Sequence, residues 1–129
     1  GGLYCRSAGP RGEPRIGYSA MEAEVSYCVT AQLPNGEVRG QYEAWLLGGH
    51  VQAVVAGGAT SAEVVRMEGP GFRVQSRYIF PDAAAFDRYV ATVAPGLRAD
   101  GMQRFGGIAG VEFSRETGTI VGGISDVEG

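Results

Sequence analysis

The sequence predicts one α+β domain in which a four-stranded antiparallel sheet carries two helices on one face. Strand-like alternation of apolar and polar residues appears in four segments, and helical periodicity appears in two. These segments follow one another in the order β-α-β-β-α-β. A chain of 129 residues with 44% hydrophobic residues is large enough for one such core and short for two.

The first strand and the first helix are predicted between residues 25 and 56. The Pro-Asn-Gly turn at 34–36 separates them. The strand alternates over residues 25–33, and the helix over residues 37–56 ends before Gly57-Gly58. Its predicted inward stripe consists of Val38, Tyr42, Trp45, Gly49, Ala53 and Ala56. The pair Gly48-Gly49 predicts a kink or a close packing contact, because each interior glycine costs about 1 kcal/mol relative to alanine.

The second half of the domain is predicted as a hairpin, a helix and a last strand. Residues 59–68 and 72–80 alternate on either side of Gly69-Pro70-Gly71, which is typical of a β-hairpin. A helix then begins at Pro81-Asp82 and stops before Pro95-Gly96. A short helical turn is predicted around residues 97–105, and a strand over residues 111–121 with a break at Gly118. The second helix should turn Phe86, Tyr89, Val90 and Val93 inward.

This order of elements is the ferredoxin-like arrangement, which packs both helices on one face of the sheet. The other face is left bare, with a mixed set of side chains: Ser26, Cys28, Thr30, Gln75 and Arg77. A second sheet is a suitable cover for it, so we expect a homodimer formed through this face.

The domain is expected to span residues 21–124, with residues 125–129 as a C-terminal tail. Residues 1–20 contain five glycines and two prolines and no apolar period, so we expect a disordered tail or one added ahead of a native start at Met21. Residues 21–129 carry 8 arginines against 13 acidic residues, a net charge of −5. Such a domain repels nucleic acid and anionic membranes.

Several classes of protein are poor matches to the sequence. Its two cysteines, Cys5 and Cys28, are far apart and predict neither a disulfide framework nor a metal site. The sequence contains no run of about 20 apolar residues and no secretory signal, so we expect a cytoplasmic protein. The absence of phosphate-binding glycine loops, paired histidines and a serine nucleophile motif excludes the common nucleotide-hydrolysing, zinc-dependent and serine-hydrolase patterns. We expect no cofactor and no metal.

Local motifs resemble an uncharacterised bacterial family, a domain of unknown function in the dimeric α/β-barrel superfamily. The resemblance covers about a hundred residues. It is carried by Trp45 and His50, by the run from Gly57 to Arg66, by residues 74–78 and 86–89, and most specifically by Ala94-Pro95, 97–101 and Arg104-Phe105-Gly106. It implies a ferredoxin-like fold and a homodimer, while the family itself has no established activity. The wider superfamily includes cofactor-free monooxygenases, polyketide-type cyclases, muconolactone-isomerase-like enzymes and heme-degrading proteins.

His50 is the candidate general base. It is the only histidine, and histidine is the side chain whose ordinary pKa lies nearest to neutral. The alternative interpretation is a structural or dimer-contact histidine. Glu43 lies two helical turns earlier, too far for a direct hydrogen bond to His50.

Further candidates lie on the strand and helix faces that we assign to the space between sheet and first helix. Tyr78 is a candidate catalytic hydrogen-bond donor, and Tyr27, Tyr42 and Trp45 are candidate ligand-binding residues, with core packing as the alternative. Arg77 shares a strand face with Arg73 and Gln75 and is a candidate carboxylate ligand or interface residue, with a solvated ion pair as the alternative. Arg98, Arg104 and Asp100 are expected to form local ion pairs.

Three functions are consistent with these residues. The first is a homodimer that binds a small apolar molecule between the sheet and the first helix. The second is a cofactor-free enzyme of the cyclase, isomerase or monooxygenase kind with His50 as base. The third is a heme-binding protein with His50 as ligand, which depends on analogy within the superfamily alone.

Overall fold

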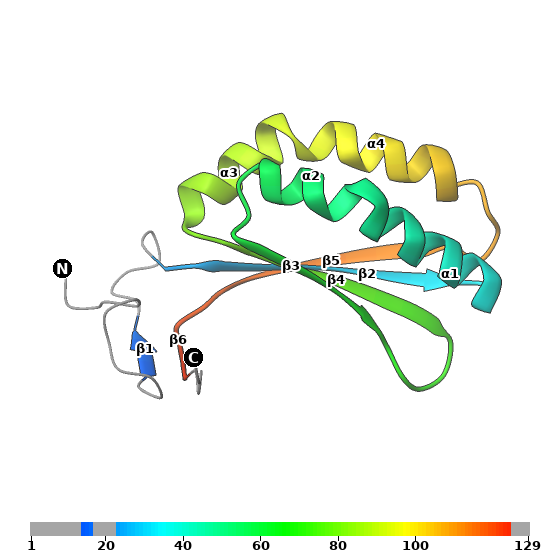
Figure 1. Ribbon diagram of the computed structural model, residues 1–129, viewed down its shortest axis with the longest axis horizontal. Coiled ribbons are helices and arrows are strands. Elements are labelled where there is room, and N and C mark those ends of the chain that lie inside the picture. The colour runs from blue at the N-terminus through cyan, green and yellow to red at the C-terminus, as the bar shows by residue number, and fades with distance from the viewer. Residues whose placement is uncertain (1–13, 17–22, 125–129) are drawn as a thin grey trace.

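The computed structural model describes residues 14–16 and 23–124, and within them a single four-stranded sheet is covered by helices on one face (Figure 1). The elements follow in the predicted order, with a short strand at each end. They are β1 (Pro14–Ile16), β2 (Val25–Leu33), α1 (Gly36–Trp45), a π-helical turn (Leu46–His50), α2 (Val51–Ala56), β3 (Ser61–Arg66), β4 (Phe72–Phe80), α3 (Ala83–Thr92), α4 (Ala94–Phe105), β5 (Glu112–Thr119) and β6 (Gly122–Ile124).

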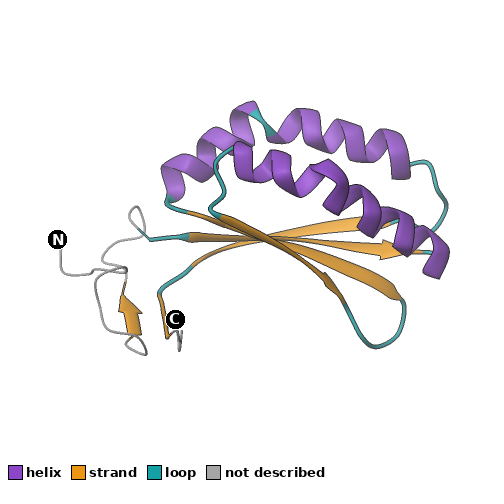
Figure 2. Cartoon of the chain, in the orientation of Figure 1, coloured by secondary structure: helices purple, strands orange, loops and turns teal. Residues whose placement is uncertain are grey.

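The large sheet has the strand order β3-β4-β2-β5, and every neighbouring pair is antiparallel. The predicted hairpin of β3 and β4 is therefore confirmed, and so is the ferredoxin-like fold class. The central strands β2 and β4 pair along their whole length, from Val25 opposite Phe80 to Leu33 opposite Phe72. Figure 2 shows all the helices in one layer above this sheet, which leaves the second face without a cover from the described residues.

The core lies between the sheet and the helices. Alternate residues of the central strands are buried there because side chains of a strand point to opposite faces in turn. The fully buried side chains with the largest volumes are Tyr78, Phe80, Leu33, Leu46, Val54, Val74 and Ser76.

The first helix is interrupted where the two glycines predicted a kink. Leu46–His50 forms a π-helical turn, and Gly49 has a φ of 151°, a left-handed conformation that favours glycine. Leu46 and Val51 are both buried, and their five-residue spacing is that of a π turn rather than of an α-helix. The predicted inward stripe is therefore wrong beyond the kink: Val51 and Val54 are buried, whereas Gly49 and Ala56 are exposed.

The second helical region is longer than predicted. The sequence suggested a short helical turn over residues 97–105, and α4 ends there but begins three residues earlier, at Ala94. Pro95 lies in its first turn, where a backbone N–H has no partner within the helix and proline is therefore tolerated. The side chain of Asp82 caps α3 by accepting a hydrogen bond from the Ala85 N–H (2.8 Å). The inward position predicted for Val90 is wrong, because Ala85 and Tyr89 define the buried side of α3 and Val90 is 37% exposed.

The ends of the chain depart from the prediction in two places. β5 continues through Gly118, which pairs with Ser26, so the predicted break does not occur. β1 pairs with β6, from Pro14 opposite Ile124 to Ile16 opposite Gly122, although the sequence indicated only a tail before residue 21. The rest of the predicted N-terminal tail, and the predicted tail at 125–129, lie outside the described residues.

Candidate functional site

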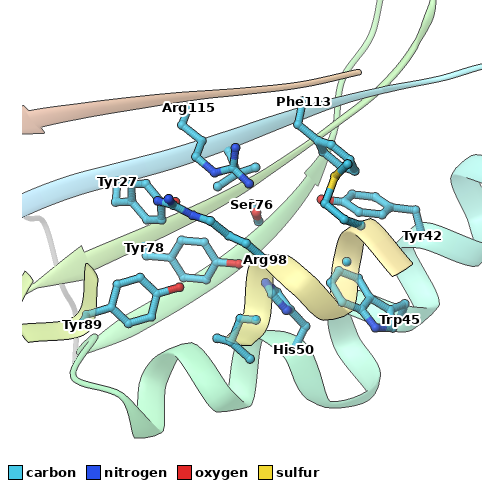
Figure 3. Close-up of a pocket in the computed structure, with 14 residues that line it drawn as sticks. Tyr27, Tyr42, Trp45, His50, Ser76, Tyr78, Tyr89, Arg98, Phe113 and Arg115 are labelled. Carbon is cyan, nitrogen blue, oxygen red and sulfur yellow. The ribbon is translucent and has the colours of Figure 1, made fainter. Parts of the chain in front are cut away.

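A pocket opens between the sheet and the helical layer, and side chains from β2, β4, β5, α3, α4 and the interrupted first helix line it (Figure 3). Most of its wall is apolar or aromatic. The lining residues are Tyr27, Val29, Tyr42, Trp45, His50, Ser76, Tyr78, Tyr89, Leu97, Arg98, Gly101, Met102, Phe113 and Arg115.

The pocket is narrow inside and open at its mouth. The enclosed cavity has a volume of about 40 Å³, with further space open to solvent at the mouth. A porphyrin is much larger than the free interior, so the shape gives no support to heme binding.

His50 reaches this pocket from the π-helical turn. Its ring stacks on the ring of Trp45, with centroids 4.3 Å apart and planes 29° apart. Its Nδ1 atom is buried, and no described residue makes a hydrogen bond to it. Burial lowers the pKa of His50, and the nearby Asp100 carboxylate raises it by a smaller amount. His50 is therefore neutral at pH 7 and free to accept a proton.

Trp45 is held in place by α4. Its indole Nε1 donates a hydrogen bond to Oδ2 of Asp100 (3.2 Å). A Cβ atom on Gly101 would lie 3.2 Å from Cη2 of Trp45, so glycine at this position allows α4 to approach the indole closely. Trp45 then forms a fixed support for the imidazole of His50.

Tyr78 presents the second buried polar atom of the pocket. Its hydroxyl makes no hydrogen bond of ordinary geometry with any described residue. Burial raises the pKa of Tyr78, and the Ser76 hydroxyl lowers it by a smaller amount without completing such a bond. Burial likewise raises the pKa of Tyr42, to about 12, and that of Tyr89. These hydroxyls are thus protonated at neutral pH and can act as hydrogen-bond donors.

Two arginines stand at the mouth of the pocket. Arg98 extends from α4 toward Tyr27, and its Nη2 lies 3.5 Å from the Tyr27 hydroxyl oxygen. Arg115 extends from β5 into the same space (Figure 3). No carboxylate of the described residues lies within ion-pair distance of either guanidinium, and no carboxylate lines the pocket.

The structure brings together five of the residues that the sequence singled out: Tyr27, Tyr42, Trp45, His50 and Tyr78. Arg77 does not line this pocket. Strand alternation places it on the open face, where Nη1 of its exposed side chain lies 3.5 Å from Oε1 of Glu63. Glu43 also lies apart from the pocket and accepts a hydrogen bond from Nε of Arg66 (2.8 Å).

The sequence analysis missed several wall residues. Of the three residues assigned to local ion pairs, Arg104 and Asp100 do pair (3.6 Å), whereas Arg98 turns into the pocket. Arg115 was not among the predicted site residues, although it lies two residues after Phe113 and so shares its inward strand face. An arginine at an inward position of a predicted strand was the sequence signal that could have identified Arg115 as a site residue.

Solved structures with similar folds support the predicted resemblance. A dimeric ferredoxin-like protein from an uncultured marine organism is 19% identical, with a TM-score of 0.64 over 78% of this chain and 97% of that one. A monooxygenase from the gene ActVA-Orf6 of Streptomyces coelicolor, solved with nanaomycin D, is 15% identical, with a TM-score of 0.62 over 80% and 92%. SnoaB, a cofactor-independent oxygenase from Streptomyces nogalater, is 13% identical, with a TM-score of 0.58 over 76% and 93%.

These likenesses establish the fold: the chain has the architecture of dimeric ferredoxin-like proteins, which the two Streptomyces proteins share. No protein-family model matches the sequence, and neither does any curated protein. In the described part of the chain no helix has the length and apolar character needed to cross a bilayer. The described residues also contain no group of three His, Cys, Asp or Glu side chains arranged to hold a metal ion.

Proposed function

We propose that this protein binds a small, planar, largely apolar molecule in the pocket and acts on it as a cofactor-independent oxygenase, with His50 as general base. The observation that carries the proposal is that two buried polar atoms, His50 Nδ1 and the Tyr78 hydroxyl, line one aromatic pocket, and neither makes a hydrogen bond of ordinary geometry with a described residue. A buried polar group without a partner costs about 1–3 kcal/mol. A ligand that supplies both partners removes that cost.

The chemistry follows from the states of these two groups. Neutral His50 can remove a proton from a carbon activated by a neighbouring carbonyl, and the protonated Tyr78 can donate a hydrogen bond to the oxygen on which charge develops. The resulting carbanion adds molecular oxygen and forms a peroxide, which takes up a proton and loses water to leave a new carbonyl. A CH₂ group and O₂ are thereby converted into C=O and H₂O, so oxygen is the only co-reactant.

The stacked Trp45 and the pocket tyrosines give this reaction a suitable setting. They form flat apolar walls for a ring system, and they keep bulk water away from the carbanion. SnoaB and the ActVA-Orf6 protein, whose folds this chain shares, are an oxygenase and a monooxygenase, and SnoaB needs no cofactor. This likeness supports the choice of oxygenation over isomerisation or cyclisation.

The test is oxygen uptake with anthrone, a planar ketone with an activated CH₂ group. Wild-type protein should consume oxygen faster than buffer, and His50→Gln should return the rate to the buffer level. Leu47→Gln is the matched control, because Leu47 lies in the same π turn but is 57% exposed. Uptake that is no faster than in buffer, or that is unchanged in His50→Gln, would refute the proposed reaction.

We also propose that the protein is a homodimer built through the open face of the sheet. That face carries charges of both signs, with Arg73 and Arg77 on β4 and Glu112 and Glu116 on β5. A twofold axis that lies between the two sheets and runs along the strands sets the β4 arginines of one copy against the β5 glutamates of the other. Light scattering at micromolar concentration should give twice the monomer mass, and Arg77→Glu should shift it toward the monomer. A monomer mass for the wild type would exclude the dimer.

A further inference from the structure

The mouth of the pocket differs in charge from the rest of the domain. Residues 21–129 carry a net charge of −5, from 8 arginines and 13 acidic residues. Two of those arginines, Arg98 and Arg115, line the pocket, and no acidic residue does. The pocket is thus a cationic opening in an acidic domain, which the proposed base chemistry does not by itself require.

The two arginines come from opposite layers of the fold. Arg98 is on α4 and Arg115 is on β5, and both side chains are directed into the space above the central strands (Figure 3). Their charges reach the interior, since both lower the pKa of Tyr89 and Arg115 also lowers that of Tyr42, against the larger effect of burial. Among the described residues, the one hydrogen bond of the Arg98 side chain is a long contact of 3.5 Å with the Tyr27 hydroxyl.

Most other arginines in the described domain interact with a partner side chain or backbone group. Arg66 pairs with Glu43, Arg77 with Glu63 and Arg104 with Asp100. Arg98 and Arg115 have no such pairing with the described carboxylates, although both stand beside an apolar wall. Guanidinium groups are well suited to bind a planar carboxylate through two parallel hydrogen bonds.

We propose that the natural ligand is a planar aromatic acid, whose carboxylate is bound between Arg98 and Arg115 while its ring lies on the aromatic wall beside His50. This inference rests on the proposed function for the ring and names the substrate class more narrowly. It also fixes an orientation: the anionic end stays at the mouth, and the reactive end points toward His50 and Tyr78. An acidic domain with a cationic mouth then selects acids over neutral compounds of the same shape.

The experiment compares two probes that differ in the carboxylate alone, 1-hydroxy-2-naphthoate and 1-naphthol. Binding is measured by calorimetry at pH 7.5 and by quenching of tryptophan fluorescence, which reports on the pocket because Trp45 is the only tryptophan of the chain. The variants are Arg98→Gln and Arg115→Gln. Arg88→Gln is the control, because Arg88 is exposed on α3 and does not line the pocket.

The wild type should bind the acid about tenfold or more tightly than the phenol, as expected when a charged hydrogen bond is added. Each pocket variant should lose about tenfold in affinity for the acid and little for 1-naphthol, and added salt should weaken binding of the acid alone. Arg88→Gln should behave as the wild type. Equal affinity of the wild type for both probes, equal loss of both in the variants, or no binding of either probe at millimolar concentration would overturn the inference.

This test separates the ligand class from the reaction. Arginine-dependent binding of the acid without oxygen uptake in the anthrone assay would keep the anion site and remove the oxygenase. Oxygen uptake that depends on His50, combined with equal binding of both probes, would keep the oxygenase and remove the anion site.

Discussion

The two faces of the sheet differ in the hydrogen bonding of their polar side chains. On the open face, Gln75 donates a hydrogen bond to the Thr30 hydroxyl (3.2 Å), and Arg77 donates one to Gln75 Oε1 (2.9 Å). On the covered face, the hydroxyl of Tyr78 is buried and makes no hydrogen bond of ordinary geometry with a described residue. Gln75, Arg77 and Tyr78 all lie on β4, so the backbone pairing of the strand does not explain the difference.

The contrast indicates where function lies. Polar groups on a solvated face can pair with one another or with water, so their arrangement carries little information about a ligand. Polar groups buried in an aromatic pocket have no such freedom, and the fold bears their desolvation cost. The covered face therefore combines the stabilising core with the candidate site, and substitutions on it should separate these two roles.

The largest effect is expected from removing core volume on the covered face. Phe80→Ala should lower the free energy of unfolding by about 3–5 kcal/mol, because Phe80 is fully buried and packs against Phe86 and Tyr89. Its neighbour Ile79 points to the open face and is half-buried, so Ile79→Ala should cost much less. Urea unfolding measures both. Equal losses at low protein concentration would mean that the open face carries a core of its own.

A smaller effect is expected at the kink that brings His50 to the pocket. Gly49→Ala should destabilise the protein by about 1–3 kcal/mol, because φ at Gly49 is 151° and alanine is strained there. Gly48→Ala is the matched control. It lies in the same turn without a positive φ, and its added Cβ meets nothing within 4 Å, so it should be neutral or slightly stabilising. Thermal unfolding measures both variants. An equal loss of stability in the two would contradict this account of the turn.

The elements of this fold could be predicted from the sequence, but the position of the site residues could be predicted only in part. Periodicity predicted β2 and β4 with their observed bounds, and the glycine pair predicted the kink. Periodicity could not show that the kink is a π turn, which moves every later residue of the helix by one position and buries Val51. Nor could it show that Arg98 turns into the pocket rather than toward Asp100, because that choice depends on how α4 packs against β5 and β2.

Removal of the Tyr78 hydroxyl separates a structural role of this group from a functional one. Tyr78→Phe should leave stability unchanged or raise it by about 1 kcal/mol, because it removes a buried hydroxyl that has no partner of ordinary geometry. The same variant should slow the anthrone reaction of the wild type. Tyr42→Phe offers a comparison at a second buried tyrosine of the pocket. A loss of 1 kcal/mol or more in Tyr78→Phe would instead indicate a stabilising hydrogen bond to Ser76.

The smallest expected effect is the pH dependence contributed by His50. Its pKa is 6.5 in the unfolded chain and lower in the folded protein because of burial. Between these two values the unfolded chain binds more protons than the folded one, so stability rises with pH through this range and is lost as the pH falls below 6.5. Glu43 does not interfere between pH 5.5 and 7.5, because the hydrogen bond from Arg66 lowers the pKa of its carboxyl below its ordinary value of 4.5. Wild-type protein should thus lose more thermal stability between pH 7.5 and 5.5 than His50→Gln, measured in buffers of equal ionic strength. A larger loss in His50→Gln would mean that folding raises the pKa of His50, and a charged imidazole of that kind would not serve as the base at pH 7.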